Sequence, residues 1–268
     1  MKLITVALLS LAAFAQPQNL SRSAIQLDLD GKYTEARALF QQVIDSAADP
    51  RAKANAQRAM AMSWAFESNC KKTGEYEQMV MDYWVTRETE EPRNAFYQEG
   101  EMANEAARVC IEAADLDSAE RWYKLGTKLG LKEPEIPADR AALWEYRLAH
   151  AQARLAARRG KRAEAEKYVA ASRAALEKMT ALRAAQAAFL PYLTGYVALY
   201  LGDAKTAAED FQKANLNDPF IQCLLAAAYE KLGEKDKAIE CYRKAYATTA
   251  HNPPAAYAKP LARKKLGV

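Results

Sequence analysis

Two series of side chains recur at helical spacing and could bind a charged ligand. The basic series is Arg140, Arg147, Arg154 and Arg158, and the aromatic series is Phe189, Tyr192, Tyr196 and Tyr200. Each series falls on one face of a helix, because residues three, four or seven positions apart share a face. Arginine forks hold carboxylates in bidentate pairs, and tyrosine rings supply flat contact area at low entropic cost. Together they could hold an acidic or carboxylate-ended peptide.

Each series also has an ordinary structural interpretation. A stripe of charges commonly forms a solvated helix face, and a stripe of aromatic rings commonly packs between helices. The spacing alone does not decide between binding and packing.

Motifs for catalysis and metal binding are missing from the sequence. It contains no Cys-x-x-Cys, His-Glu-x-x-His, Gly-x-Ser-x-Gly or phosphate-binding glycine loop. The two histidines, His150 and His251, are about a hundred residues apart and have no carboxylate at ligand spacing. We therefore expect no cofactor, no metal ion and no enzymatic activity. A glycosidase-like pair of carboxylates in an α-helical shell is the enzymatic alternative.

The composition favours an all-helical protein that does not bind nucleic acid. Half of the residues are apolar, 27% are charged, and only 10 Gly and 10 Pro are present, which excludes turn-dense all-β folds. The net charge is only +4, yet residues 16–135 carry 15 Lys and Arg against 21 Asp and Glu, and residues 136–268 carry 22 against 13. This difference in charge between the two halves has three possible meanings: it arises by chance, it orients a charged partner, or it lets two copies dock head to tail.

The N-terminus has the organisation of a secretory signal peptide. Lys2 precedes an apolar run that ends at Ala13-Phe14-Ala15, a small-x-small cleavage pattern. The run is too short to span a bilayer, and no other window is long and apolar enough. We expect cleavage after Ala15 and an exported mature chain, periplasmic or secreted, that does not span a membrane. An amphipathic first helix is the alternative.

A repeating frame of small and large residues organises the chain into helix pairs. The turn positions of this frame are Gly31, Gly74, Ala114, Gly160, Gly202 and Gly233. In most frames a small residue lies seven residues before the turn, another lies five residues after it, and a large residue lies nine after it. Small residues let two antiparallel helices approach closely, and the large residue fills the space between pairs. Prolines near the starts of the first helices fit this frame, because a missing N–H costs nothing there. These are Pro50, Pro92, Pro137 and Pro219.

This frame resembles the tetratricopeptide repeat family, over about residues 19–250. The resemblance is strongest in the last two frames, which share Gly-Asp/Glu-x-x-x-Ala, and weakest around Gly74. Most turn spacings exceed the family period of about 34 residues. The chain looks like an exported bacterial-type member. The resemblance implies an all-α fold, a right-handed superhelical array of antiparallel helix pairs. Its parts are a signal peptide in residues 1–15, about six pairs in 16–252 and a polar capping helix or tail in 253–268.

The resemblance also implies which side chains face the concave groove of the array. In the family, the first helix of each pair lines the groove at about 13, 10, 6 and 3 or 2 residues before the turn. These offsets select Trp64, Asn104, Arg108, Arg147, His150, Arg154, Arg158, Tyr192, Tyr196 and Tyr200. The Lys/Asn pattern of the family's carboxylate clamp is not reproduced, and only Asn104 and Arg108 are similar to it.

The four cysteines could form two disulfides. Cys70 and Cys110 occupy the same offset before neighbouring turns, and Cys223 and Cys241 could face each other across one pair. Stacked helices lie about 8–10 Å apart, whereas a disulfide needs Cα atoms within roughly 7 Å. Alternatively, these cysteines are buried small fillers.

Two hypotheses of function follow. The leading one is a non-enzymatic scaffold, in the periplasm or outside the cell, that binds a protein or an extended peptide in its concave groove. The alternative is a self-associating structural module that assembles head to tail through its oppositely charged halves. The partner and the oligomeric state stay open.

Overall fold

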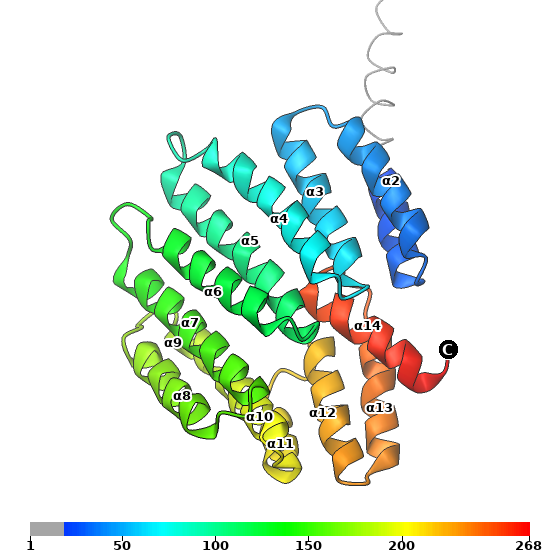
Figure 1. Ribbon diagram of the computed structural model, residues 1–268, viewed down its shortest axis with the longest axis vertical. Coiled ribbons are helices and arrows are strands. Elements are labelled where there is room, and N and C mark those ends of the chain that lie inside the picture. The colour runs from blue at the N-terminus through cyan, green and yellow to red at the C-terminus, as the bar shows by residue number, and fades with distance from the viewer. Residues whose placement is uncertain (1–18) are drawn as a thin grey trace, which may run out of the picture.

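The computed structural model describes residues 19–268, and every regular element within them is a helix. Six antiparallel pairs precede a last helix (Figure 1). The first helices of the pairs are residues 19–29, α3 (Pro50–Ala65), α5 (Pro92–Glu112), α7 (Ala138–Arg158), α10 (Leu190–Tyr200) and α12 (Pro219–Lys231). The second helices are α2 (Tyr33–Asp45), α4 (Cys70–Val85), α6 (Leu116–Gly130), α8 (Arg162–Glu177), α11 (Ala204–Phe211) and α13 (Lys235–Tyr246). The short α9 (Arg183–Ala187) precedes α10, and α14 is Pro253–Leu266.

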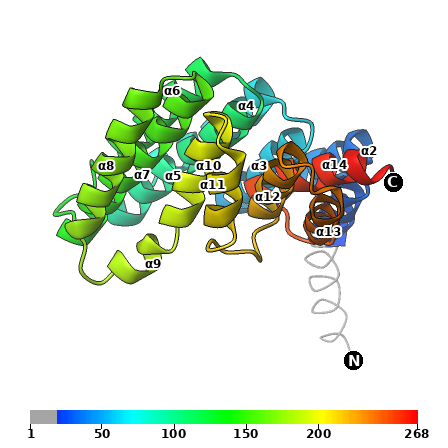
Figure 2. The same cartoon turned by 90° about the horizontal axis from the view of Figure 1, so that it is seen from below.

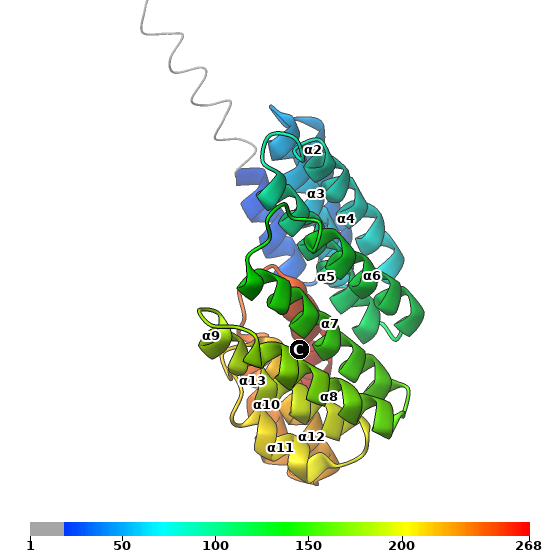
Figure 3. The same cartoon turned by 90° about the vertical axis from the view of Figure 1, so that its left-hand side faces the viewer.

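Helices that follow one another in the chain also stack in space (Figure 3). The predicted all-α array of helix pairs is therefore confirmed. The predicted signal peptide, residues 1–15, lies outside the described residues. Among the helices of residues 19–268, none combines the length and the apolar character needed to cross a membrane.

Prolines and capping side chains fix where the helices begin. Pro50, Pro92 and Pro219 are the first residues of their helices, and Pro137 directly precedes α7, as predicted. A proline there removes no helical hydrogen bond. Several helices start after a side chain that accepts a bond from the first-turn backbone N–H groups. These capping residues are Asp49, Asn69, Asp115, Asp203, Asp218 and Asn252.

Five of the six predicted turn positions have the left-handed backbone that ends a first helix. They are Gly31, Ala114, Gly160, Gly202 and Gly233. The prediction for Gly74 was wrong, because Gly74 lies inside α4. A Cβ at Gly74 would sit 3.0 Å from the indole of Trp122 on α6, so its small size serves packing between pairs. The turn of that pair is at Ser68, with φ of 55°.

With the turn moved to Ser68, this pair fits the frame of the others. Ala61, seven residues before Ser68, and Thr73, five residues after it, are both fully buried. The corresponding small residues of the other frames are Ala24, Ala36, Ala107, Ala119, Ala153, Ala165, Ala207, Ala226 and Ala238, all buried, together with Gly195. Close helix approach at these positions builds the core of the array.

The last helix closes the array onto its beginning. Helix α14 packs on α12 and α13, and it also contacts α3 and α5 (Figure 2). Nε2 of His251, just before α14, lies 2.8 Å from Oδ2 of the buried Asp28 in the first helix. Arg263 donates from Nη2 to the carbonyl oxygen of Leu29 at 2.6 Å. Helix α14, at the end of the array, buries a row of small residues and bridges the two ends.

Candidate ligand-binding cavity

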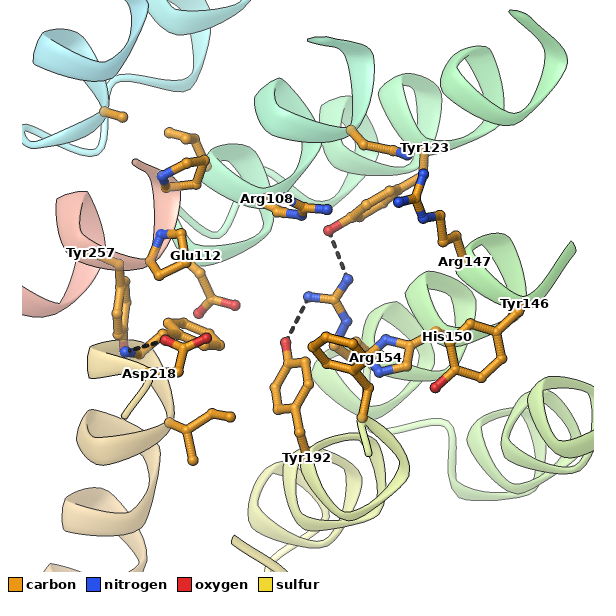
Figure 4. A pocket seen from close by; sticks show the side chains of 18 of the residues that line it. Arg108, Glu112, Tyr123, Tyr146, Arg147, His150, Arg154, Tyr192, Asp218 and Tyr257 are labelled. Carbon is orange, nitrogen blue, oxygen red and sulfur yellow. Dashed lines mark hydrogen bonds between the residues drawn. The ribbon is translucent and has the colours of Figure 1, made fainter. Parts of the chain in front are cut away.

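Closure of the array leaves a cavity of about 340 Å³ on its inner side. First helices α5, α7, α10 and α12 line it, and the start of α14 covers one side (Figure 4). Of the ten side chains selected from the sequence, six line it: Asn104, Arg108, Arg147, His150, Arg154 and Tyr192. Phe189 of the aromatic series lines it as well.

Arg154 is a buried cation at the centre of this cavity, with only 6% of its surface exposed. Its Nη2 donates to the hydroxyl oxygen of Tyr123 at 2.8 Å, and its Nη1 donates to that of Tyr192 at 3.0 Å (Figure 4). Its Nε has no hydrogen-bond partner among the described residues. Among residues 19–268, Arg154 forms no ion pair with a carboxylate: both of its hydrogen bonds go to neutral hydroxyls, and the charge of Glu112 acts on it without an ion pair.

The other arginines of the basic series are paired with carboxylates. Arg140 pairs with Glu133 at 3.0 Å, Arg147 pairs with Glu101, and Arg158 pairs with Glu112 at 3.1 Å. The interpretation that the whole basic series is free to bind a ligand is therefore corrected. Three of its four members are neutralised by α5 or by the segment after α6, because α7 packs beside these elements.

Arg158, Tyr196 and Tyr200 pack behind the cavity rather than line it. Arg158 donates from Nη1 to the hydroxyl oxygen of Tyr196 at 3.1 Å, and Tyr196 in turn donates to Glu112 at 2.9 Å. Tyr196 is fully buried. For these three residues the packing interpretation holds, because α7 and α10 are neighbours and their facing side chains satisfy one another.

Two further side chains of the cavity have polar atoms without partners. Nε2 of His150 and Nδ2 of Asn104 are buried and make no hydrogen bond to another described residue. Burial and the neighbouring Arg154 hold the pKa of His150 well below its ordinary value, so the ring is neutral near pH 7. A buried polar group without a partner costs free energy, and such groups mark a place for a ligand or water.

The cavity has an acidic side that the sequence analysis missed. Glu112 and Asp218 line it together with the cations Arg108 and Arg154. Glu112 is already paired with Arg158, but no cation in residues 19–268 forms an ion pair with Asp218. Burial raises the pKa of Asp218, and the nearby Arg108 opposes that rise. Arg108 itself makes no ion pair with a described residue.

Apolar and aromatic side chains form the remaining walls of the cavity. They include Val109, Phe189, Phe220, Ile221, Pro253, Pro254 and Tyr257. Glu112 lies two residues before the turn at Ala114, so the family offsets would have found it. The residues of α14 carry no such signal, because only the closure of the array brings them to the cavity.

Trp64 was selected from the frame of Gly74 and lies away from the cavity. It sits at the end of α3, where the guanidinium carbon of Arg37 from α2 lies 3.8 Å from the ring centroid. The wrong turn position shifted this selection by six residues along the chain.

The structure contains one of the two considered disulfides. Cys70, at the start of α4, is bonded to Cys110, near the end of α5, with their Cα atoms 4.6 Å apart. Cys223 and Cys241 are buried free thiols. The second possible disulfide is therefore not formed, and these two cysteines fit the alternative of buried small residues; Cys223 donates from Sγ to the carbonyl oxygen of Ala258 on α14, at 3.6 Å.

Comparison with known proteins places one helix pair in a family. Residues 221–250 match the family model of the tetratricopeptide repeat. This segment holds nearly all of α12 and α13, the pair whose sequence frame is among the clearest. A tetratricopeptide repeat indicates a scaffold for protein interaction. No curated protein matches the chain.

Proposed function

We propose that this protein is a non-enzymatic peptide-binding scaffold that takes a carboxylate group of its ligand into the inner cavity. The carboxylate binds Arg154 and Arg108, and the chain that carries it lies against the aromatic walls. Because the signal-like N-terminus resembles that of exported proteins, we also propose that the protein acts in the periplasm or outside the cell.

The observation that carries this proposal is the state of Arg154. A buried guanidinium ordinarily has a carboxylate partner, since an unpaired buried charge is costly. Arg154 has two tyrosine hydroxyls as partners instead, and its Nε has none among the described residues. A ligand carboxylate would complete this set of donors, and each charged hydrogen bond of that kind contributes roughly 1.5–3 kcal/mol.

The head-to-tail alternative has less support. Ion pairs between the basic and acidic halves form within the chain, for example Arg147 with Glu101 and Arg159 with Glu120. The end of the array is joined to its start by His251 and Asp28. These contacts use charges and a terminal surface that a second copy would need.

Binding of fluorescent peptides by the full chain tests the proposal. We expect N-acetylated hexapeptides with a free C-terminal carboxylate to bind, and the same peptides with a C-terminal amide to bind at least about tenfold more weakly. Arg108→Gln should reduce this preference. Arg121→Gln, on the exposed face of α6, is the matched control and should leave it unchanged.

Equal binding of acid and amide peptides would refute the role of the two arginines. Arg158→Glu would break the buried ion pair with Glu112 and lower the free energy of unfolding, so a loss of binding in that variant would not report on the cavity.

A further inference from the structure

The charges of the inner cavity are separated into two unpaired groups of opposite sign. Arg147 is paired with Glu101, and Glu112 is paired with Arg158. Among the described lining residues, the charged side chains that form no ion pair are therefore the cations Arg108 and Arg154 and the anion Asp218. Figure 4 shows Asp218 across the open centre of the cavity from Arg154.

Asp218 is held in place by the backbone. It is the N-cap of α12, and its Oδ1 accepts from the backbone N–H of Phe220 at 2.9 Å. This bond orients the carboxylate but does not neutralise it. Arg108 is close enough to lower the pKa of Asp218 but does not form an ion pair with it. The two charges therefore face a shared space, and neither satisfies the other.

Closure of the array limits what can occupy that space. The start of α14 contributes Pro253, Pro254 and Tyr257 to the lining, α9 contributes Gln186, and the residue before α10 is Phe189. A volume of about 340 Å³ is near the lower end of the range for small-molecule sites, roughly 300–1,000 Å³. This volume holds a free amino acid or a dipeptide as a whole, whereas only the terminal part of a longer peptide would lie inside it.

We propose that the cavity binds a free α-amino acid or dipeptide as a zwitterion, with its carboxylate at Arg108 and Arg154 and its ammonium group at Asp218. An apolar side chain of the ligand packs on Phe189, Phe220 and Ile221. This inference rests on the proposed function, since it uses the same cavity, but it adds a second charged contact. The carboxyl end of a long protein lacks the nearby ammonium group and would leave Asp218 half-buried and unpaired.

Calorimetric titration of the full chain tests the two charged contacts separately. The probes are L-leucine, L-phenylalanine and Leu-Leu, each compared with its N-acetyl derivative and its C-terminal amide. We expect the free zwitterions to bind, and the loss of either terminal charge to weaken binding at least about tenfold.

Two conservative variants assign each charge to its residue. Asp218→Asn keeps a capping oxygen for Phe220 and removes only the charge, so it should abolish the discrimination against N-acetyl-L-leucine. Arg108→Gln should reduce the discrimination against L-leucinamide. Asp203→Asn, at the cap of α11 and exposed, and Arg121→Gln are the matched controls. Both controls should retain wild-type selectivity, and a thermal melt of each variant verifies folding.

The outcomes separate this inference from the proposed function. Two results would refute the zwitterion site and leave carboxylate capture standing. In the first, N-acetyl-L-leucine binds as tightly as L-leucine. In the second, none of the three free probes binds, whereas the acetylated hexapeptide acids do. Failure of the probes and of all the peptides refutes both. Unchanged selectivity in Asp218→Asn also refutes the assignment of the ammonium contact.

Discussion

Tyrosine hydroxyls keep the charge of Arg154 available. A carboxylate in a direct ion pair would satisfy the guanidinium and cancel its field, whereas a hydroxyl accepts a hydrogen bond and adds no negative charge. The ring centroids of Tyr123, Tyr192 and Tyr196 lie 5.4 to 5.7 Å from the guanidinium carbon, which adds cation–π stabilisation. Arg154 thus remains stable in the fold while staying able to bind an anion.

Glu99 makes stability depend on pH. Its side chain on α5 is 1% exposed, and burial together with Glu88 raises its pKa to about 7. The folded state therefore binds more protons than the unfolded state, in which the pKa is about 4.3. The free energy of unfolding should fall as the pH rises from about 4.3 to about 7, by on the order of 3 kcal/mol from this residue.

Urea denaturation of Glu99→Gln at several pH values measures this contribution. The slope of stability against pH should become smaller, and not vanish, because burial also raises the pKa of Glu77. Glu166→Gln, on an exposed side chain of α8, should leave the slope as in the wild type. A slope that is unchanged in Glu99→Gln would show that Glu99 ionises freely in the fold.

At the scale of helices, glycines set how closely α5, α6 and α7 approach. A Cβ at Gly100 of α5 would lie 2.8 Å from the carbonyl oxygen of Gly126 on α6 and 2.5 Å from the ring of Trp144 on α7. Helix propensity alone favours alanine over glycine by about 1 kcal/mol. The clash with backbone reverses this preference.

We therefore expect Gly100→Ala to lower the free energy of unfolding by about 1–3 kcal/mol, as overpacked cores do. Chemical denaturation measures the change. A stabilised variant would mean that α5 and α6 can separate without loss of packing.

The elements were largely predictable from the sequence, and the contacts between distant elements were not. Proline starts, glycine turns and small residues are local signals, and they located most pairs. The turn at Ser68 was not predicted, because serine rarely takes a left-handed backbone and the nearby Gly74 has the residue type expected at a turn. The pairing of Arg158 with Glu112 and the place of Tyr257 depend on which helices meet, and the spacing within one helix does not contain that information.

At the scale of the whole molecule, the contact of His251 with Asp28 joins residues 223 positions apart. The imidazole also packs between Phe40 and Phe66, with ring centroids 5.6 and 5.5 Å away. Asp28 accepts in addition from Ser63 at 2.8 Å. This cluster fastens the segment before α14 to the first two pairs.

His251→Ala should loosen both ends of the array together. It leaves the buried Asp28 without its ring partner, and we expect a loss of about 2–4 kcal/mol in the free energy of unfolding. Hydrogen exchange should become faster in α14 and in residues 19–29 alike. Lys264→Ala, exposed on α14, is the control. If hydrogen exchange became faster in α14 alone, the contact of His251 with Asp28 would not be what holds the two ends together.

Closure also restricts how such a chain can change in length. Open repeat arrays depend on contacts between nearest neighbours, so a repeat can be added or removed at modest cost. Here a gain or loss of one helix pair would shift His251 and Arg263 away from Asp28 and Leu29, and it would break the wall that α14 gives the cavity. The number of pairs is thus tied to the cavity, and we expect variation among related chains to occur in outer loops rather than in repeat number.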